Sequence, residues 1–334
     1  MKYGNEPLLD VQNLGVSFSF NKKPYLVVRD VSFSVKRNEI LGIVGESGSG
    51  KSVTVKTILR LIPDPPGHVE SGNIIFDGQD ILKLKMNEIY GIRGNRISMI
   101  FQEPMTSLNP VFTCGDQIAE AIMLHQGVGR AEAKEKTIEV LERVKIPMPE
   151  KRYHAYPHEM SGGMRQRVMI AIALSCSPEM LIADEPTTAL DPTIQAQILS
   201  LMKQLQKENG MSVLLITHDL GVVAETCSRV IVMYGGMIME EASVHDLFHN
   251  PLHPYTQGLM KAIPHVHKNV DRLYTIRDKV PHYTEMPQGC PFHPRCEFSC
   301  EACKIQEPKV IQLKDGHKTR CIRYKEFIRG GLKI

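Results

Sequence analysis

The sequence lacks a long apolar run, an apolar leader and a strong excess of charge of either sign. Its longest apolar runs, such as residues 168–174 and 230–234, are far shorter than the about 20 residues that a membrane-spanning helix needs. The first ten residues contain no apolar core of a signal peptide, so we expect the chain to remain in the cytoplasm. A formal net charge of +3 over 334 residues gives no support for nucleic-acid binding. Any role at a membrane therefore requires partner chains.

Internal repeats and low-complexity segments are also absent, and the remaining composition is ordinary. Hydrophobic residues make up 42% of the chain and charged residues 23%, which is typical of a globular protein. A length of 334 residues predicts two domains, or one large domain with a small one.

The eight cysteines are distributed unevenly along the chain. Cys114, Cys176 and Cys227 lie among apolar or mixed neighbours, which predicts buried free thiols. The other cysteines all follow residue 289 and are Cys290, Cys296, Cys300, Cys303 and Cys321. Disulfides are not expected in a cytoplasmic chain, so this cluster indicates a different, local cause.

A glycine-rich stretch fits the phosphate-binding loop G-x-x-x-x-G-K-[ST] between a strand and a helix, the context that this loop requires. It comprises Gly45, Glu46, Ser47, Gly48, Ser49, Gly50, Lys51 and Ser52. Glycines allow a tight turn, and inward-facing N–H groups at a helix N-terminus favour phosphate oxygens. Lys51 can place its charge on the β- and γ-phosphates, and the Ser52 hydroxyl can bind Mg²⁺. The stretch therefore predicts a site for a nucleoside triphosphate.

The segments around this loop alternate between strand and helix patterns, which predicts an α/β fold with a mostly parallel sheet. Residues 8–20 and 27–36 predict two strands joined by a turn, as in an antiparallel N-terminal β-subdomain. Residues 103–178 are dominated by helical patterns and predict a helical insertion. We expect residues 1–264 to form the nucleotide-binding domain and residues 265–334 a small cysteine-rich extension.

Two aromatic residues near the N-terminus are candidates for stacking on the adenine ring. Phe18 is the first choice and Tyr25 the second, because both lie in or beside the predicted strands that precede the loop. The alternative for each is that the ring only packs within the sheet.

Polar residues come directly after several apolar strands, at the edge where ligands bind in parallel α/β sheets. They are Gln102, Asp184, Glu185 and His218. Adjacent residues of a strand point to opposite faces, so Asp184 can hold Mg²⁺ through water while Glu185 polarises the attacking water. The Gln102 amide can reach Mg²⁺ and that water, and His218 can donate to the γ-phosphate. Solvated polar residues at strand ends are the alternative.

A second phosphate-type site begins at Ser161-Gly162-Gly163, just before a helix predicted over residues 164–175. A hydroxyl, small residues and a helix N-terminus together favour an anion. Since a first loop already binds the phosphates, we expect a head-to-tail dimer, in which each subunit lays this segment on the nucleotide held by the other.

Together these motifs resemble the nucleotide-binding subunit of an ABC transporter over residues 8–263. The resemblance identifies residues 45–52 as Walker A, Gln102 as the Q-loop, residues 161–166 as the signature, residues 180–185 as Walker B, residues 188–191 as the D-loop and His218 as the switch histidine. The common signature Leu-Ser-Gly-Gly-Gln is Met-Ser-Gly-Gly-Met here, which keeps the serine and glycines.

The resemblance implies ATP and Mg²⁺ as cofactors. It implies catalytic roles for Glu185, His218 and Gln102, and Mg²⁺ binding by Ser52, Gln102 and Asp184. Besides the loop and the two aromatic candidates, it implies ATP contacts by Val53, Ser161, Gly162, Gly163 and Asp191.

A narrower likeness concerns the dipeptide/oligopeptide importers, and it rests on residues 102–110, 156–160, 253–256 and 289–296. In that branch four cysteines of the tail bind an iron–sulfur cluster. The spacing matches Cys290, Cys296, Cys303 and Cys321, which leaves Cys300 as an extra thiol. Four thiolates also suit tetrahedral zinc, so a [4Fe–4S] cluster is the first expectation and zinc the alternative.

The resemblance implies an ATPase subunit at the cytoplasmic face of the cell membrane that powers import of dipeptides or oligopeptides. Its expected partners are a second ATPase subunit, either the same chain or a sibling, and two transmembrane permease subunits. An extracellular peptide-binding protein takes part indirectly, and no nucleic acid is expected. The alternatives are an importer ATPase for another small solute such as nickel, a soluble ABC ATPase without transport, and a non-catalytic regulator, which Glu185 and His218 disfavour.

Overall fold

The computed structural model of the chain describes residues 6–102, 107–188, 190–263, 274–313, 315–329 and 332. The chain divides into two compact units, and each is described by itself. Unit 1 comprises Met1–Leu8, Val35–Glu39 and Lys83–Ile216, and unit 2 comprises Leu9–Ser34, Ile40–Leu82 and Thr217–Ile334. Among the residues described, no helix combines the length and the apolar character of a membrane span.

Unit 1 is built on parallel strands, namely β6 (Ile97–Ile100), β7 (Met180–Asp184) and β8 (Ser212–Ile216). β7 pairs with β6 on one side and with β8 on the other, both in parallel. Every residue of β7 and β8 is buried, which explains why these strands are continuous apolar runs without alternation. The parallel register brings the carboxyl ends of the strands to one edge.

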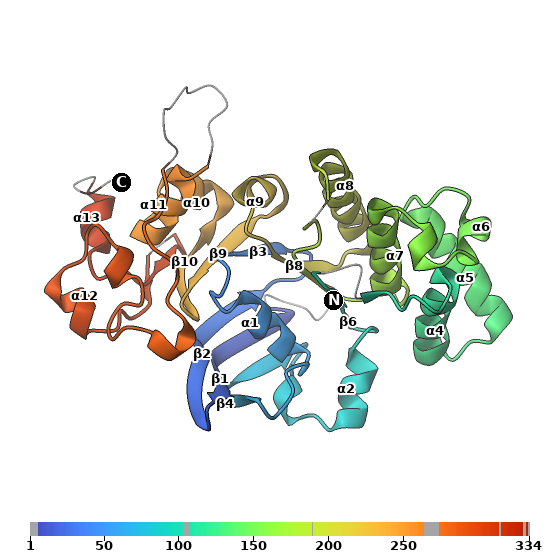
Figure 1. Cartoon of the computed structure of the whole chain (residues 1–334), viewed down its shortest axis with the longest axis horizontal. Helices are drawn as coiled ribbons and strands as arrows, with labels where there is room; N and C mark the ends of the chain where they lie inside the picture. The colour runs from blue at the N-terminus through green and yellow to red at the C-terminus, as the bar shows by residue number, and fades with distance from the viewer. Residues whose placement is uncertain are drawn as a thin grey trace. The chain divides into compact units, whose positions relative to one another are not determined.

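Helices make up most of the remainder of unit 1, and they confirm the predicted helical insertion between β6 and β7. The helical elements of the unit are α2 (Met86–Ile92), α4 (Cys114–Gln126), α5 (Arg130–Arg143), α6 (Pro149–Tyr153), η2 (Pro157–Glu159), α7 (Gly162–Leu174) and α8 (Pro192–Asn209). α4, α5, α6 and α7 pack against one another as one group, drawn in green in Figure 1. Side-chain caps define several starts: Thr113 accepts the Asp116 N–H at the start of α4.

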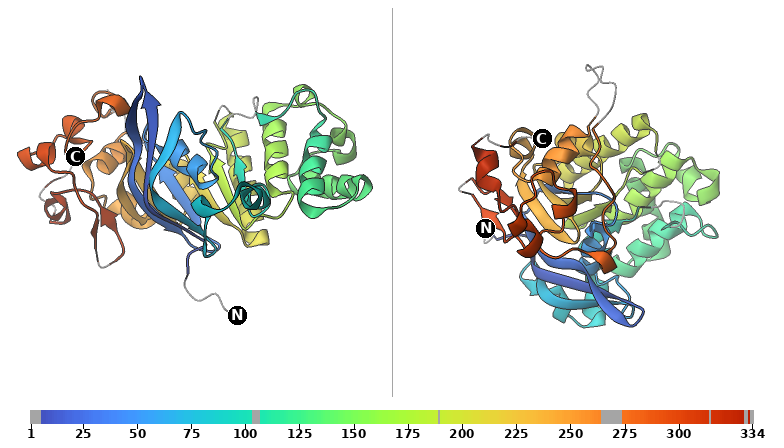
Figure 2. Two further views of the ribbon diagram at one scale, coloured as in Figure 1. Left: turned by 90° about the horizontal axis from the view of Figure 1, so that it is seen from below. Right: turned by 60° about the vertical axis from the view of Figure 1, so that its left-hand side comes forward.

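Unit 2 contains an antiparallel sheet in the order β2-β1-β4-β5, which confirms the antiparallel N-terminal prediction. Its strands are β1 (Leu9–Phe20), β2 (Lys23–Val35), β4 (Gly67–Phe76) and β5 (Gln79–Asp80), followed by η1 (Ile81–Lys83). Figure 2 shows the long blue strands β1 and β2 side by side. The buried apolar residues of β1, such as Leu9, Val11 and Leu14, hold one face of this sheet on the core.

A second group of strands in unit 2 carries the phosphate loop. β3 (Ile40–Val44) pairs in parallel with β9 (Arg229–Tyr234), and β9 continues through a hairpin to antiparallel β10 (Met237–Ser243). α1 (Lys51–Ile58) begins directly after the loop, and the later helices are α9 (Leu220–Thr226), α10 (Val244–His249) and α11 (Pro254–Lys261). The loop therefore leaves the carboxyl end of a buried parallel strand.

The C-terminal part of unit 2 joins these strands and their core. Its elements are η3 (Tyr283–Glu285), η4 (His293–Arg295), α12 (Glu301–Ile305), β11 (Ile311–Gln312), β12 (Lys318–Thr319) and α13 (Tyr324–Ile328). β12 pairs antiparallel with β10, and β11 with β12. Cys290 and Phe292 belong to the same buried cluster as Tyr234 and Tyr255. The predicted boundary at residue 264 lies outside the described residues and stays a prediction.

Candidate functional site

The phosphate loop has a backbone that only glycine can supply at two positions. Gly45 has a φ of 152°, and a Cβ there would lie 2.2 Å from the Met233 carbonyl oxygen. Gly50 has a φ of 97° and forms the N-cap of α1. Both positions therefore need the glycines of the motif. Ser47 and Gly48 form the exposed tip of the loop.

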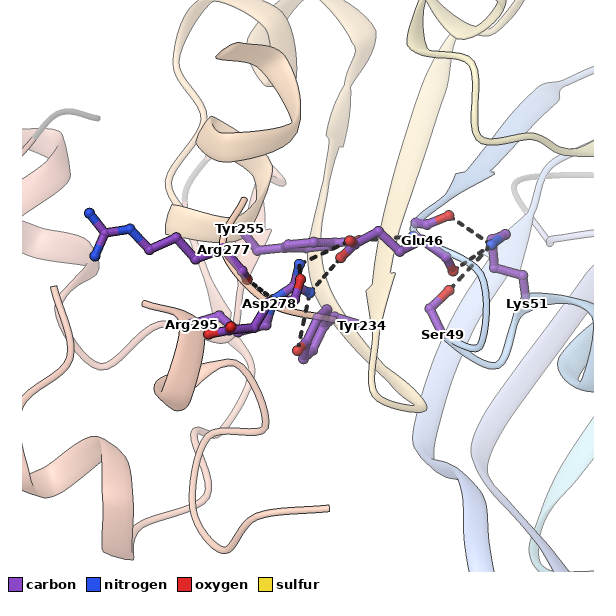
Figure 3. Close-up of polar contacts among 9 residues, drawn as sticks. Glu46, Ser49, Lys51, Tyr234, Tyr255, Arg277, Asp278 and Arg295 are labelled. Atoms are coloured by element: carbon purple, nitrogen blue, oxygen red, sulfur yellow. Dashed lines mark hydrogen bonds and ion pairs between the residues drawn. The ribbon is translucent and has the colours of Figure 1, made fainter. Parts of the chain in front are cut away.

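Lys51 lies folded into the loop that precedes it. Its ammonium donates to the carbonyl oxygens of Gly45 at 2.7 Å and of Glu46 at 3.0 Å, and to Ser49 Oγ at 3.4 Å (Figure 3). Lys51 is only 6% exposed, whereas Ser52 and Val53, in the first turn of α1, are half-buried. The buried ammonium is thus held by the loop that precedes it.

In unit 1 a small group of polar side chains follows β6 and β7. Gln102 Nε2 donates to Glu185 Oε2 at 3.0 Å, and Thr188 Oγ1 donates to the same oxygen at 2.9 Å. Asp184, the last residue of β7, is 2% exposed. Gln102 and Glu185, both expected at the carboxyl ends of strands, are therefore in direct contact.

Glu185 leaves the strand in an unusual backbone conformation. Its φ is 48°, in the left-handed region that non-glycine residues rarely adopt. Its N–H donates to the Ile216 carbonyl oxygen at 2.9 Å, and its own carbonyl accepts the Thr188 N–H at 3.2 Å. Such conformations cost about 1–3 kcal/mol and concentrate at functional sites. In this conformation the Glu185 carboxylate accepts the hydrogen bonds from Gln102 and Thr188.

His218, in unit 2, is exposed and comes before the start of α9. Asp219 caps that helix by accepting the N–H groups of Gly221 and Val222 through Oδ1, at 2.8 and 3.3 Å. The Asp219 N–H in turn donates to Thr217 Oγ1 at 3.0 Å. These bonds fix the backbone on both sides of the histidine.

Two further predicted ATP contacts cap helices of unit 1. Ser161 Oγ accepts the Met164 N–H at 3.4 Å at the start of α7, and both Ser161 and Gly162 are exposed. Asp191 Oδ1 accepts the Ile194 N–H at 3.0 Å at the start of α8. Of the predicted D-loop, Ala189 lies outside the described residues, as do residues 103–106 after Gln102. The exposed start of α7 leaves Ser161 accessible to another molecule.

The two candidate adenine-stacking residues both have neighbours within unit 2. Phe18 is half-buried, and its ring lies beside Gly67 at the start of β4. Tyr25 packs edge-on against Tyr283, with ring centroids 6.2 Å apart. The assignment of either residue to adenine stacking stays a prediction.

The four cysteines assigned to the tail motif line one cavity, and Cys300 does not. Cys290, Cys296, Cys303 and Cys321 all face it, together with Phe292 and Phe327 among others. Burial raises the pKa of Cys290 and of Cys321 to about 12, and that of Cys296 to about 11. These thiols therefore keep their protons unless a cation binds them.

None of the cysteines is in a disulfide, and no group of three or more His, Cys, Asp or Glu side chains in the described ranges is arranged to hold a metal ion. Cys300 Sγ lies 3.5 Å from Cys303 Sγ. The structure thus places the four cysteines around one cavity.

Two residues that no sequence pattern assigns to the site contact the phosphate loop. The Tyr255 hydroxyl accepts the Glu46 N–H at 2.9 Å, and Arg295 forms an ion pair with the Glu46 carboxylate at 2.7 Å (Figure 3). Both lie far along the chain from the loop, in segments singled out only for their likeness to a family. Spacing along the sequence carries no signal for such contacts.

Comparison with known proteins gives a consistent result. The family model described as ABC transporter matches residues 28–188, and the model described as oligopeptide/dipeptide transporter, C-terminal region, matches residues 239–303. A probable peptide ABC transporter ATP-binding protein, y4tR of Sinorhizobium fredii, is 53% identical, with 96% of each chain covered. The chain belongs to the ABC transporter ATP-binding proteins. Within them it falls in the oligopeptide/dipeptide branch.

Other relatives and solved structures agree. The oligopeptide transport ATP-binding protein AppD of Bacillus subtilis is 49% identical, covering 96% of this chain and 97% of AppD. The dipeptide transport ATP-binding protein DppD of Escherichia coli is 47% identical, covering 94% and 96%. The dimeric ATP-binding cassette MJ0796, in a post-hydrolysis state bound to ADP and Pi, aligns with a TM-score of 0.64 at 27% identity, covering 71% of this chain and 98% of that chain. The chain is therefore an ABC-type ATPase.

Proposed function

We propose that this ABC-type ATPase powers the import of dipeptides or oligopeptides through a transporter whose membrane-spanning subunits are separate chains. The observation that carries the proposal is full-length similarity, at 47–53% identity, to proteins named for peptide transport. The match of residues 239–303 to the C-terminal region of oligopeptide/dipeptide transporters supports it independently. The chain would act at the cytoplasmic face of the membrane through contact with those subunits.

The proposed chemistry divides the predicted residues by role. Lys51 and the N–H groups of the loop would bind the phosphates, the Ser52 hydroxyl would bind Mg²⁺, and Asp184 would hold Mg²⁺ through water. Glu185 accepts a proton from the water that attacks the γ-phosphate. Gln102, which donates to Glu185 Oε2, orients this carboxylate and contacts Mg²⁺, and His218 donates to the γ-phosphate.

We further propose that two ATPase subunits close on two ATP molecules. The exposed start of α7, at Ser161 and Gly162, would contact the nucleotide held by the other subunit, and Asp191 would approach the same interface. The dimeric state named for the related cassette supports this arrangement. The second subunit is either another copy or a sibling chain, and an extracellular peptide-binding protein would supply the cargo.

Uptake of labelled cargo tests the proposal. Cells in which the gene for this chain is deleted are expected to lose uptake of a labelled di- or oligopeptide, and the intact gene should restore it. Uptake of ⁶³Ni²⁺ should be the same in both strains. Loss of nickel uptake with unchanged peptide uptake would move the chain to a different cargo, and no change in either would contradict a role in import.

For the tail we propose a [4Fe–4S] cluster held by Cys290, Cys296, Cys303 and Cys321. The observation that supports it is that these four thiols line one cavity while Cys300 does not. When bound, the cluster would supply four iron–thiolate bonds that tie together a segment with few elements of its own.

Metal analysis of anaerobically purified protein checks this assignment. We expect about four iron atoms and about four acid-labile sulfides for each chain, as a cubane cluster contains. Substitution of Cys321 by serine should lower both values, whereas substitution of Cys300 should leave them unchanged. One zinc for each chain without iron would contradict the cluster.

A further inference from the structure

Arg295 occupies a site in which every one of its side-chain donors has an acceptor. Nη1 and Nη2 donate to the two carboxylate oxygens of Glu46, at 2.7 and 3.0 Å. Nε donates to the Arg277 carbonyl at 2.7 Å, Nη2 also to the Asp278 carbonyl at 3.0 Å, and Nη1 to the Tyr234 hydroxyl at 3.4 Å. The guanidinium has five N–H donors, and these five hydrogen bonds occupy all of them. Figure 3 shows Arg295 between the Glu46 carboxylate, the Tyr234 hydroxyl and the backbone carbonyls of Arg277 and Asp278.

The environment of this pair makes it unlike a surface salt bridge. The Arg295 side chain is 2% exposed and that of Glu46 is 31% exposed. The guanidinium carbon also lies 5.6 Å from the centre of the Tyr234 ring and 5.9 Å from that of Phe292. A bidentate, charge-assisted ion pair of this kind fixes the orientation of the two side chains as well as the distance between them. Glu46 therefore has one defined side-chain position.

Glu46 is held at its backbone as well as at its side chain. Its N–H donates to the Tyr255 hydroxyl at 2.9 Å, and its carbonyl oxygen accepts from Lys51 Nζ at 3.0 Å. Tyr255 is fully buried, and its ring packs against Tyr234 at 4.8 Å between centroids. The Glu46 carbonyl, which accepts a hydrogen bond from Lys51, thus belongs to a residue that Tyr255 and Arg295 hold in place.

We propose that Arg295 is a positioning residue for the phosphate loop: it fixes Glu46, and through the Glu46 carbonyl the ammonium of Lys51, in the arrangement that receives ATP. It also neutralises a carboxylate in a loop that must accept the negative charge of a triphosphate. This inference rests on the proposed role of the loop in ATP binding. It gives the tail a direct part in that binding, beyond any contribution to folding.

The position of Arg295 connects the loop with the cysteine cavity. Arg295 ends η4, which lies between Cys290 and Cys296, and Cys296 is the next residue. The Cys290 carbonyl accepts the His293 N–H at 3.0 Å, at the start of the same turn. Because η4 is a single short turn between Cys290 and Cys296, the positions of these two cysteines determine the position of Arg295.

The test compares the affinity of full-length variants for Mg·ATP, measured by calorimetry, with their thermal unfolding in the absence of nucleotide. Arg295→Lys keeps the positive charge and most of the aliphatic side chain but cannot form the bidentate contact with the Glu46 carboxylate. Arg295→Met removes the charge as well. The matched control is Arg29→Met. Arg29 also forms an ion pair that joins the tail to the rest of unit 2, but its partner is Glu307 and not a residue of the loop.

We expect Arg295→Lys to weaken Mg·ATP binding by about tenfold, Arg295→Met by more, and Arg29→Met by less than twofold. The double variant Glu46→Gln with Arg295→Lys should bind Mg·ATP no more weakly than whichever single variant binds it less tightly. Both substitutions disrupt the same contact, the one between Arg295 and Glu46, so their effects should not add. Since Arg295→Lys preserves the packing of the stem, its unfolding temperature reports whether the fold is intact.

Several results would overturn the proposal. These are wild-type affinity in Arg295→Lys, an equal loss in Arg29→Met, or additive losses in the double variant. If affinity in all variants merely followed the unfolding temperature, Arg295 would be structural only. Failure of the wild-type chain itself to bind Mg·ATP would instead contradict the proposed function, so the two failures are distinguishable.

Discussion

Replacing Glu185 by glutamine is expected to lower the rate of ATP hydrolysis by about 100-fold or more, the usual contribution of a general base. The amide keeps the size and one oxygen of the carboxylate, so the hydrogen bonds from Gln102 and Thr188 can remain. It cannot take a proton from the attacking water. ATP should therefore bind and stay uncleaved, and the closed dimer should accumulate. Phosphate release at saturating Mg·ATP measures the effect.

The matched control for this variant is Glu208→Gln. Glu208 is exposed on α8, where it accepts a hydrogen bond from Gln204 at 2.7 Å, and its substitution should leave turnover unchanged. Nucleotide recovered from the Glu185→Gln protein should be ATP, and that from the wild type ADP. Wild-type turnover in Glu185→Gln would remove this residue from the mechanism.

The second large effect concerns Lys51. Substitution by alanine is expected to weaken Mg·ATP binding by roughly 10- to 100-fold, because a hydrogen bond to a charged group contributes about 1.5–3 kcal/mol. The loss includes the contacts that Lys51 makes with the Gly45 and Glu46 carbonyls, so the empty loop should also lose its defined shape. The measurement is the rise in unfolding temperature caused by Mg·ATP.

The rise reports binding because a ligand present at about 100 times its Kd stabilises the folded state by about 2.7 kcal/mol. Wild type should show a clear rise and Lys51→Ala little or none. Lys56→Ala provides the control, since Lys56 lies in the last turn of the same helix, away from the loop. An unchanged rise in Lys51→Ala would contradict the assignment of the loop as the phosphate site.

Local patterns predicted those parts of the fold that depend on neighbours in sequence. The loop is recognisable because a buried strand, glycines with positive φ and a helix start must follow one another directly. The positions of Gln102 and Glu185 at the carboxyl ends of strands were also predictable, because parallel strands end at one edge, whereas the hydrogen bond between them is seen only in the folded chain. The roles of these residues in catalysis remain predictions.

Elements that depend on distant partners were harder to predict. The prolines and glycines of residues 63–72 are typical of a connection, yet β4 begins at Gly67 and pairs with β1 from there onward. Gly72, with a φ of 98°, lies where the register of that pairing shifts, so a glycine that indicates a turn accommodates a bulge. Only the partner strand distinguishes the two.

The tail shows the same limit for the site. Histidines, prolines and cysteines after residue 264 are typical of a linker and a small appendix, but β12 pairs with β10 and Arg295 reaches Glu46. These contacts join residues that are far apart in sequence and follow no period. These contacts are evident only in the folded chain, in which residues of β9, α11 and η4 lie close to the loop.

Transport by the assembled transporter in proteoliposomes, with this chain and Mg·ATP both on the inner side of the vesicle membrane, tests most directly whether the chain drives peptide import. We expect peptide to accumulate inside only with ATP, and Glu185→Gln in this chain alone to reduce both accumulation and peptide-stimulated phosphate release to a small fraction of wild type. Peptide accumulation at the wild-type rate with the Glu185→Gln chain would contradict this expectation.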